Sequence, residues 1–291
     1  MFKVTLAFHN RGQSVSFSPP PLDFLDNTAL SVASTFSNGG SSSSCINIDE
    51  YAPRDIAGME EWATTCGVQK ADGFTFTNGE GYGGATEFGV GTELDILAEE
   101  PVLFVPNQMI ITGAKAREEY GPLETAEGLF ERLQTTKDLP HFYVFLKVLK
   151  EYESGTDSPW YYWLNSLPRY FSNGSSMTHL CSDLLPPLVG SLVSLERVRF
   201  RQFFRALKHV DFLPENIRSD KALAKWAFAI VYTRSFPLYP DAEGNYQDVQ
   251  LVPMVDMVRT KTTNLRTKQH ETILTQTRNI DFFHRTVQSR N

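Results

Sequence analysis

The sequence predicts an α+β fold in which a core of short β-strands is interrupted by a helical insertion. Strand-like patterns occupy residues 73–112, helical periodicity runs over about 120–236, and a strand-like pattern resumes over 246–257. An insertion inside one β domain explains this order better than alternating βαβ units, which would mix the two periods along the chain. We therefore expect one domain over 48–257, between two segments of different composition.

Both flanking segments have compositions typical of disordered chain. Residues 1–47 are rich in Ser, Pro and Gly, and too little apolar surface is present there to offset the entropy of ordering. Residues 258–291 carry seven Lys or Arg and two Asp or Glu, a net charge of +5, whereas residues 1–257 carry −12. This contrast is compatible with a basic tail and equally with an altered reading frame in the gene model.

The composition of the chain already limits the classes of function that it can have. The 291 residues are enough for a sizeable core, and the 41% hydrophobic content fits a folded protein. The net charge of −7 gives no reason to expect nucleic acid as a partner. Since no apolar run approaches the roughly 20 residues of a membrane span, no membrane association is expected either. We expect a monomer.

Cysteine and histidine usage indicates an intracellular protein without a metal. Cys45, Cys66 and Cys181 are too widely spaced for a disulfide framework or a zinc site. The six histidines show no metal-ligand spacing. The expected compartment is the cytoplasm or nucleus, and a weak likeness of residues 1–22 to a transit peptide leaves the plastid open.

Strands are predicted on both sides of the helical region. Residues 73–77 alternate apolar and polar side chains, and a glycine-rich turn follows. Residues 101–106 and 108–111 then have the pattern of short strands punctuated by prolines. After the helices, residues 249–254 are predicted as a further strand.

Three helices of the insertion are predicted from apolar side chains at i, i+3, i+4 and i+7. They cover residues 142–149, with Gly155 as a stop, 200–207, and 223–230, where Ser219 or Asp220 would cap the start. A basic stripe recurs at helical spacing around the second of them. A solvated helix face is the simpler interpretation, and an acidic partner or nucleic acid is the alternative. The stripe consists of Arg197, Arg201, Arg205 and Lys208.

Two glycine-rich segments precede the insertion. Residues 79–84 fit the dinucleotide fingerprint GxGxxG, but no helical pattern follows to face a pyrophosphate, so a surface turn is favoured. Gly89-Val90-Gly91 differs, because it lies between strand-like segments. Two glycines around one residue allow the backbone to approach a ligand closely and to take positive φ.

An arginine follows the apolar body of the last predicted helix. Residues 225–233 are mostly apolar and run into Arg234. Such an arginine is commonly a surface residue or an ion-pair partner. The functional alternative is a fixed cationic fork that holds a carboxylate.

Taken in order, several segments resemble the SET-domain methyltransferases of the Rubisco large-subunit lysine methyltransferase class, which includes the actin-histidine methyltransferase. The resemblance covers about 50–257 and rests on the order and spacing of the segments. The segments are Trp62 with Cys66-Gly67-Val68, Gly89-Val90-Gly91, Leu94-Asp95-Ile96, Leu103-Phe104-Val105-Pro106, Ile110-Ile111-Thr112, Trp163-Leu164-Asn165-Ser166-Leu167-Pro168, Trp226-Ala227-Phe228 through Thr233-Arg234-Ser235-Phe236, and Leu251-Val252-Pro253-Met254-Val255-Asp256-Met257.

This resemblance implies transfer of a methyl group from S-adenosyl-L-methionine to a lysine or histidine of a protein substrate. Gly89, Val90 and Gly91 match the family's cofactor-binding backbone. Arg234 and Asp256 match an arginine and an aspartate that shape the cofactor and substrate pocket. Because methyl transfer is an in-line displacement, positioning supplies much of the catalysis.

The sequence departs from the family after Met257. Arg259 and Thr260 stand where the family has an Asn-His pair that binds the cofactor, and no tyrosine follows Tyr246. The catalytic tyrosine of the family therefore matches no residue here, and the C-terminal part of the SET core is expected to be missing or replaced. Two interpretations stay open: an impaired methyltransferase, and an inactive truncated relative that acts as an interaction module or is a gene-model fragment. A nucleotide-binding protein that uses residues 79–84 is a third.

Overall fold

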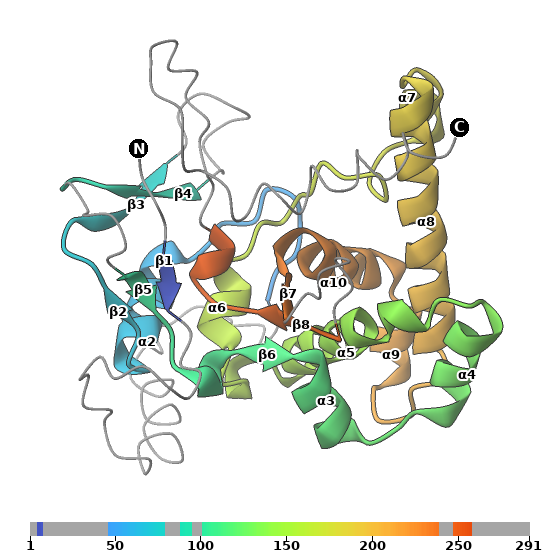
Figure 1. Ribbon diagram of the computed structural model, residues 1–291, viewed down its shortest axis with the longest axis horizontal. Coiled ribbons are helices and arrows are strands. Elements are labelled where there is room, and N and C mark those ends of the chain that lie inside the picture. Colours follow the sequence, from blue (N-terminus) through green and yellow to red (C-terminus); the bar gives the residue numbers. More distant parts are fainter. Residues whose placement is uncertain (1–4, 8–45, 79–87, 95–100, 239–246, 258–291) are drawn as a thin grey trace, which may run out of the picture.

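The computed structural model describes residues 5–7, 46–78, 88–94, 101–238 and 247–257. Within these ranges the strands lie at the left and centre of Figure 1, and most of the helices lie at the right. Helices and strands thus occupy largely separate regions, as the predicted α+β class requires.

The described core begins with a capped helix. Helix α2 (Ile56–Thr65) starts after Asp55, whose carboxylate accepts a hydrogen bond from the Gly58 amide at 2.8 Å. The chain turns beyond this helix at Gly67, which has a φ of 88° that favours glycine. Trp62 therefore lies in the last turn of α2, and Gly67 lies in the turn that follows the helix.

Five strands described before residue 105 form two sheets. In one sheet the central strand has a parallel neighbour on one edge and an antiparallel neighbour on the other, in the order β1-β5-β2. In the other sheet two strands pair antiparallel. The strands are β1 (Thr5–Ala7), β2 (Gln69–Lys70), β3 (Phe74–Asn78), β4 (Phe88–Thr92) and β5 (Pro101–Phe104).

A third sheet joins the chain on either side of the helices. Strand β8 (Asp248–Leu251) pairs antiparallel with β6 (Ile111–Thr112) on one edge and with β7 (Phe236–Leu238) on the other. Helix α3 begins at Gly113 directly after β6, and α10 ends at Arg234 just before β7. Helices α3 to α10 therefore lie between strands of one sheet.

Eight helices and four 3-10 turns are described between residues 106 and 257. The helices are α3 (Gly113–Tyr120), α4 (Glu124–Arg132), α5 (Leu139–Ser154), α6 (Tyr161–Ser166), α7 (His179–Asp183), α8 (Pro187–Leu207), α9 (Glu215–Ser219) and α10 (Lys221–Arg234). The 3-10 turns are η2 (Asn107–Met109), η3 (Thr136–Asp138), η4 (Gly155–Asp157) and η5 (Val255–Met257).

The three helices predicted from apolar periodicity are confirmed as α5, α8 and α10. Helix α5 ends where Gly155 takes a φ of 57°, so the predicted stop is correct. Of the two candidate caps before α10, Asp220 fulfils the role, because its carboxylate accepts hydrogen bonds from the amides of Ala222 and Leu223. Ser219 instead ends α9.

Two strand predictions need correction. Residues 108–111, predicted as a strand, form η2 and only then enter β6, because Pro106 turns the chain and the Ile110 amide bonds back to Asn107 O at 3.2 Å. The strand predicted over 249–254 ends at Leu251, since Pro253 has no amide for a ladder and Met254 takes a φ of 67°.

The expectation of disorder over residues 1–47 is wrong for Thr5–Ala7, which form β1. Strand β5 has β2 on one edge, so β1 supplies partners for the backbone groups of the other edge. Folded structure also begins slightly before residue 48, because Ile46 is buried in the core. Residues 8–45 and the tail at 258–291 lie outside the described residues.

Aromatic side chains fill the centre of the helical insertion. The ring of Phe203 on α8 lies between 5.3 and 5.6 Å, centre to centre, from rings on three other helices. Its partners are Phe130 on α4, Phe142 and Phe145 on α5, and Phe228 on α10. Four helices thus share one core. No helix in the described ranges is both long and apolar enough to span a membrane.

Replacing Phe203 by Ala should lower the free energy of unfolding by about 3–5 kcal/mol, because the buried ring leaves a cavity among four helices. Urea denaturation would measure the loss. The control is Tyr51→Ala, at a side chain that is 89% exposed, and it should change stability by less than about 0.5 kcal/mol. Equal effects of the two substitutions would contradict this core.

Candidate functional site

Two of the predicted site residues meet in a buried ion pair. Arg234 is the last residue of α10, and Asp256 lies in the middle of η5. Nη1 of Arg234 donates to Oδ2 of Asp256 and to its backbone oxygen, both at 2.8 Å. The Asp256 side chain is fully buried and that of Arg234 is 11% exposed. The arginine therefore holds a carboxylate of its own chain, which is the ion-pair interpretation of the sequence.

The local sequence explains how these two side chains meet. The buried apolar body of α10 packs on α5 and α8 and leaves Arg234 at the helix C-terminus, where a positive charge is favoured by the helix dipole. After β8, Met254 takes its positive φ, and the Asp256 amide donates to Val252 O at 3.1 Å. This tight turn directs the Asp256 carboxylate back toward α10.

A tryptophan of the insertion completes the surroundings of the carboxylate. Nε1 of Trp163, on α6, lies 3.4 Å from Oδ1 of Asp256 and donates to it. Trp163 is itself fully buried. Residues 163–168 resemble a segment of the family, but the sequence alone indicates no role for Trp163. Its partner is 93 residues away in sequence, so no local signal points to the contact.

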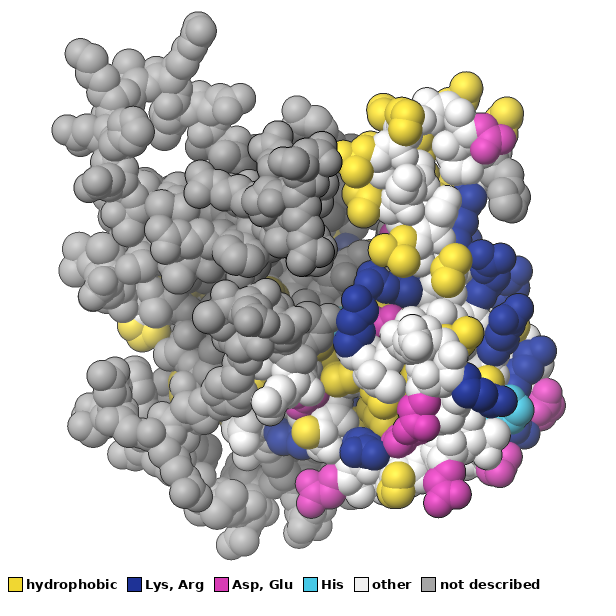
Figure 2. Space-filling model, turned by 45° about the vertical axis from the view of Figure 1, so that its right-hand side comes forward, with side chains coloured by type: hydrophobic (Ala, Val, Ile, Leu, Met, Phe, Trp, Pro, Cys, Tyr) yellow, Lys and Arg dark blue, Asp and Glu magenta, His cyan; other side chains and the backbone are white. Residues whose placement is uncertain are grey.

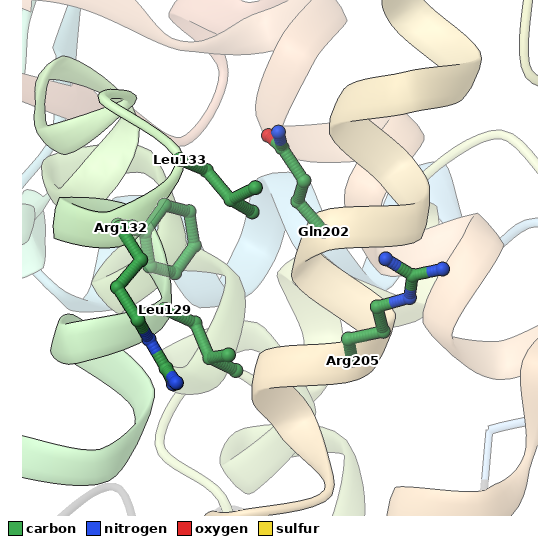
Figure 3. A pocket seen from close by; sticks show the side chains of 6 residues that line it. Leu129, Arg132, Leu133, Gln202 and Arg205 are labelled. Atoms are coloured by element: carbon green, nitrogen blue, oxygen red, sulfur yellow. The ribbon is translucent and has the colours of Figure 1, made fainter.

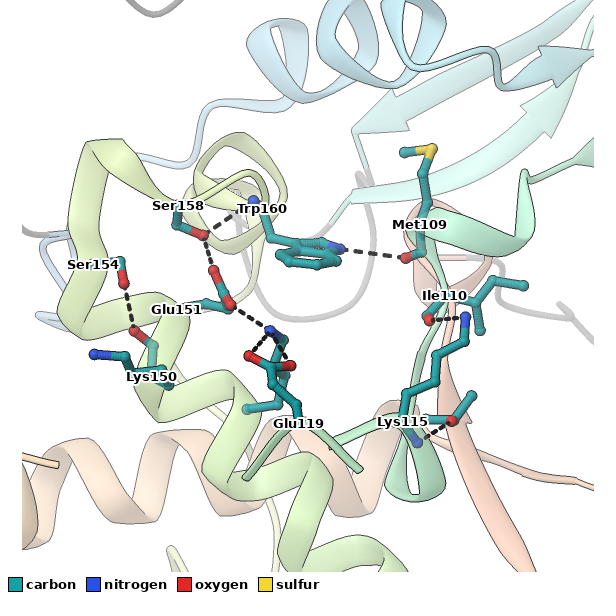
Figure 4. A network of polar contacts seen from close by, with 11 residues as sticks. Met109, Ile110, Lys115, Glu119, Lys150, Glu151, Ser154, Ser158 and Trp160 are labelled. Carbon is teal, nitrogen blue, oxygen red and sulfur yellow. Dashed lines mark hydrogen bonds and ion pairs between the residues drawn. The ribbon is translucent and has the colours of Figure 1, made fainter. Parts of the chain in front are cut away.

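A network of polar contacts fixes α6, and it is drawn in Figure 4. The ammonium of Lys147 on α5 contacts Glu119 at 2.7 Å and Glu151 at 2.8 Å, and lies 4.9 Å from the centre of the Trp160 ring. Ser158 donates to Glu151 at 2.6 Å and accepts from the Trp160 amide at 3.0 Å. The start of α6 is thereby held against α3 and α5, which sets the position of its tryptophan.

The strand that holds the glycine triplet contacts η5, the turn that holds Asp256. Gly89, Val90 and Gly91 are the centre of β4, which pairs with β3 on one side and packs against η5. Neither glycine has a positive φ, so that explanation of the two glycines is wrong: both are extended strand residues. The structure therefore joins Arg234 to Asp256 and brings the strand that holds the glycine triplet into contact with the turn that holds Asp256.

The two glycines differ in what surrounds them. A Cβ on Gly91 would lie 3.1 Å from Cγ2 of Thr77, which is tighter than ordinary contact. A Cβ on Gly89 would meet only Oγ1 of Thr77, at an ordinary distance of 3.8 Å. Packing among the described residues therefore accounts for glycine at position 91 and leaves room for a side chain at position 89.

Arg54 is a functional candidate that the sequence analysis missed. Its Nε donates to Ser166 O, at the end of α6, at 2.6 Å. Its guanidinium lies 4.9 Å from the ring centre of Phe88, the first residue of β4. Arg54 thus connects the glycine-bearing strand to the insertion. A single arginine in a loop carries no motif, so only the fold reveals its place.

Burial and the neighbouring positive charges shift the pKa of Asp256 in opposite directions. Complete burial raises the pKa of Asp256, while Arg234, the hydrogen bond from Trp163 and the charge of Arg54 oppose the rise. Nε of Arg234 is buried and has no hydrogen-bond partner among the described residues. A buried guanidinium N–H without a partner is costly, and it suits a ligand oxygen, above all a carboxylate.

Other features of the sequence lie apart from this site. A hollow of about 260 Å³ between α4 and α8 contains none of the five predicted residues (Figure 3). In the basic stripe, Arg201, Arg205 and Lys208 are exposed, whereas Arg197 is partly buried and bonds to Met177 O at 2.6 Å. Within the described ranges, no group of His, Cys, Asp and Glu could hold a metal ion. The glycine-rich loop over 79–84 lies outside those ranges.

Comparison with known proteins leaves the family of this chain open. No family model matches the sequence, and no curated protein matches it either. The chemistry of the site therefore rests on the geometry described above and on the resemblance of the sequence segments.

Replacing Arg234 by Met should lower the free energy of unfolding by about 3–5 kcal/mol at neutral pH, because it leaves a buried carboxylate without its partner. The control is Lys150→Met, which breaks a half-exposed pair with Glu153 and should cost less than about 1 kcal/mol. Urea denaturation measures both variants.

The loss of unfolding free energy caused by Arg234→Met should become smaller as the pH falls. Asp256 already has a raised pKa when folded, and removal of the guanidinium raises it further. The folded variant then binds a proton more tightly than its unfolded chain does, so stability is retained at low pH and lost as pH rises through the folded pKa. A deficit that stays constant between about pH 5 and pH 8 would refute this account.

Proposed function

We propose that this chain is a SET-type relative that binds S-adenosyl-L-methionine beside β4 and the Arg234–Asp256 pair, and that it transfers a methyl group to a lysine or histidine of a protein. The observation that carries the proposal is the buried Nε of Arg234, which has no partner among the described residues. Through its ion pair with Asp256 and the contact of η5 with β4, it lies near segments that resemble the family's first core segment, insert and C-terminal core.

The residues present fit such a cofactor. Nε of Arg234 is a donor for the carboxylate of the cofactor, and the space that the described residues leave at Gly89 allows the cofactor to approach the backbone of β4. When bound, the cofactor supplies a methyl group on a positively charged sulfur. Asp256 is already engaged by Arg234 and Trp163, so its part is to hold the arginine in place. These residues bind and orient, which is the main requirement of an in-line displacement.

A second function is favoured by a specific observation. Arg259 and Thr260 stand where the family has its Asn-His pair, and residues 258–291 contain no tyrosine. A chain that binds the cofactor without transferring methyl, and that serves as an interaction module, follows from this. The two functions share the cofactor site and differ only in turnover.

Cofactor binding can be tested at Gly89 with a matched control. Gly89→Val places a side chain where packing leaves room, so it should keep the fold and raise the Kd for S-adenosyl-L-methionine at least about 30-fold, or 2 kcal/mol. Gly128→Val adds the same side chain on α4, where nothing lies within 4 Å, and should leave the Kd unchanged. Isothermal titration calorimetry measures both.

Two outcomes would reject this binding site. One is wild-type protein that releases no heat with millimolar cofactor. The other is equal weakening by Gly89→Val and Gly128→Val, which would indicate a general effect on the fold rather than a contact at β4.

Turnover is tested separately, with cofactor labelled in its methyl group and protein extract as substrate. Methyl transfer to lysine or histidine, located by mass spectrometry and lost in Gly89→Val, supports the methyltransferase. Binding without transfer leaves the inactive relative as the function of this chain.

A further inference from the structure

Apolar side chains gather on one exposed surface of the insertion. Among the described residues, eleven large apolar side chains are exposed, and seven of them belong to α7, α8 and the turn between them. Several of these side chains appear in Figure 2 as the yellow groups along the upper part of α8. A cluster of this kind marks an interaction surface rather than scattered exposure. The seven, here called the leucine ridge, are Leu180, Leu184, Leu188, Val189, Leu192, Leu195 and Val198.

The ridge lies on the N-terminal part of α8, whereas four of the five buried residues of this helix lie in its C-terminal part, from Phe200 to Leu207. At 100° per residue, Leu188, Leu192 and Leu195 fall within an arc of about 60° on α8. On the same projection Phe203 and Ala206, which are buried, fall on the side of these leucines, whereas the buried Val193 lies about 130° away. The exposed leucines therefore continue the core stripe of α8 beyond the core, as an apolar face without a partner among the described residues.

Hydrogen bonds hold the ridge in a fixed shape. The guanidinium of Arg197 donates to Ser182 Oγ at 3.1 Å and to Thr178 O at 3.0 Å, which ties α7 to the side of α8. The side chain of Glu196 accepts from the amides of Gly174 and Ser175. A preformed apolar surface can associate without a large cost in conformational entropy.

We propose that the leucine ridge is the interface with a second copy of this chain, in which two α8 helices pair antiparallel about a two-fold axis. A two-fold interface brings the same surface together with itself, so it must be self-complementary. Residues 184–195 contain no charged side chain, so apolar surface meets apolar surface without like-charge repulsion.

The charge pattern of α8 selects the antiparallel arrangement. Residues 187–195 of the helix are uncharged, and its remainder carries Glu196, Arg197, Arg199, Arg201 and Arg205. Of these, Arg199 falls within the arc of the leucines. A parallel pair would set Arg199 against its own copy, whereas an antiparallel pair places the two copies at opposite ends. The same charges disfavour residues 258–291 as the cover, since that segment has a net charge of +5.

The exposed area is sufficient for a dimer of modest affinity. Seven side chains exposed to this extent present on the order of 600 Å² of apolar surface, the upper end of what monomers show. Two copies would bury roughly 1,200 Å², which is the size of the smaller specific interfaces. This inference does not depend on the proposed methyl transfer, and it departs from the monomer expected from the sequence.

Sedimentation equilibrium on the full chain, from about 1 to about 100 µM, tests the proposal. The expected result is a monomer–dimer equilibrium. Leu192→Glu sets two carboxylates against each other at the centre of the interface and should raise the dissociation constant at least about 100-fold. Tyr51→Glu adds the same charge at an exposed position away from the ridge and should leave it unchanged. Circular dichroism melting checks that both variants fold.

Alkylation of Cys181 gives a second readout, because this exposed thiol lies on α7. In the wild type its alkylation should be slower at the high concentration than at the low one, and in Leu192→Glu it should be fast at both. A wild type that stays monomeric, or a dimer unaffected by Leu192→Glu, overturns the proposal. If the wild type is monomeric, slow alkylation of Cys181 would show that another part of the same chain covers the ridge. Fast alkylation of the monomer would show that the ridge needs a different partner.

Discussion

The buried ion pair between Arg234 and Asp256 is the interaction on which the rest of the structure depends. The third sheet contains strands of only two to four residues, and few ladder hydrogen bonds hold its ends together. The ion pair also connects α10, the last helix of the insertion, to the segment after β8. Because desolvation offsets much of the attraction in a buried pair, its main contribution is to fix one arrangement of these segments.

The strongest periodic signals in the sequence were the ones that predicted structure correctly. Helices α5, α8 and α10 follow from apolar residues at helical spacing, because burial of one face outweighs local preferences over many residues. Residues 108–111 were wrongly predicted as a strand because a pattern of only four residues carries little information. The turn at Pro106 determined the path of the chain there. Short segments depend on their neighbours in the fold rather than on their own composition.

Some residues of the candidate site could be identified from the sequence, and others only from the structure. Arg234 and Asp256 were chosen by resemblance and form one ion pair, and β4 with its glycine triplet contacts the turn that holds Asp256. Trp163 and Arg54, by contrast, make contacts across 93 and 112 residues and could not be assigned from the sequence. The two glycines looked equivalent in the sequence. Only the structure separates Gly91, which Thr77 requires to be small, from Gly89, which has no such constraint among the described residues.

The position of the insertion also affects how the chain can fold during synthesis. Thr112 of β6 pairs with Gln250 of β8, so β6 emerges from the ribosome more than a hundred residues before its partner. At about 5–20 residues per second, that edge stays unpaired for on the order of ten seconds. The aromatic core around Phe203 is complete at α10, before β8 exists, so the insertion can fold first and the sheet can close last. The interval is one in which chaperones can bind the open strand.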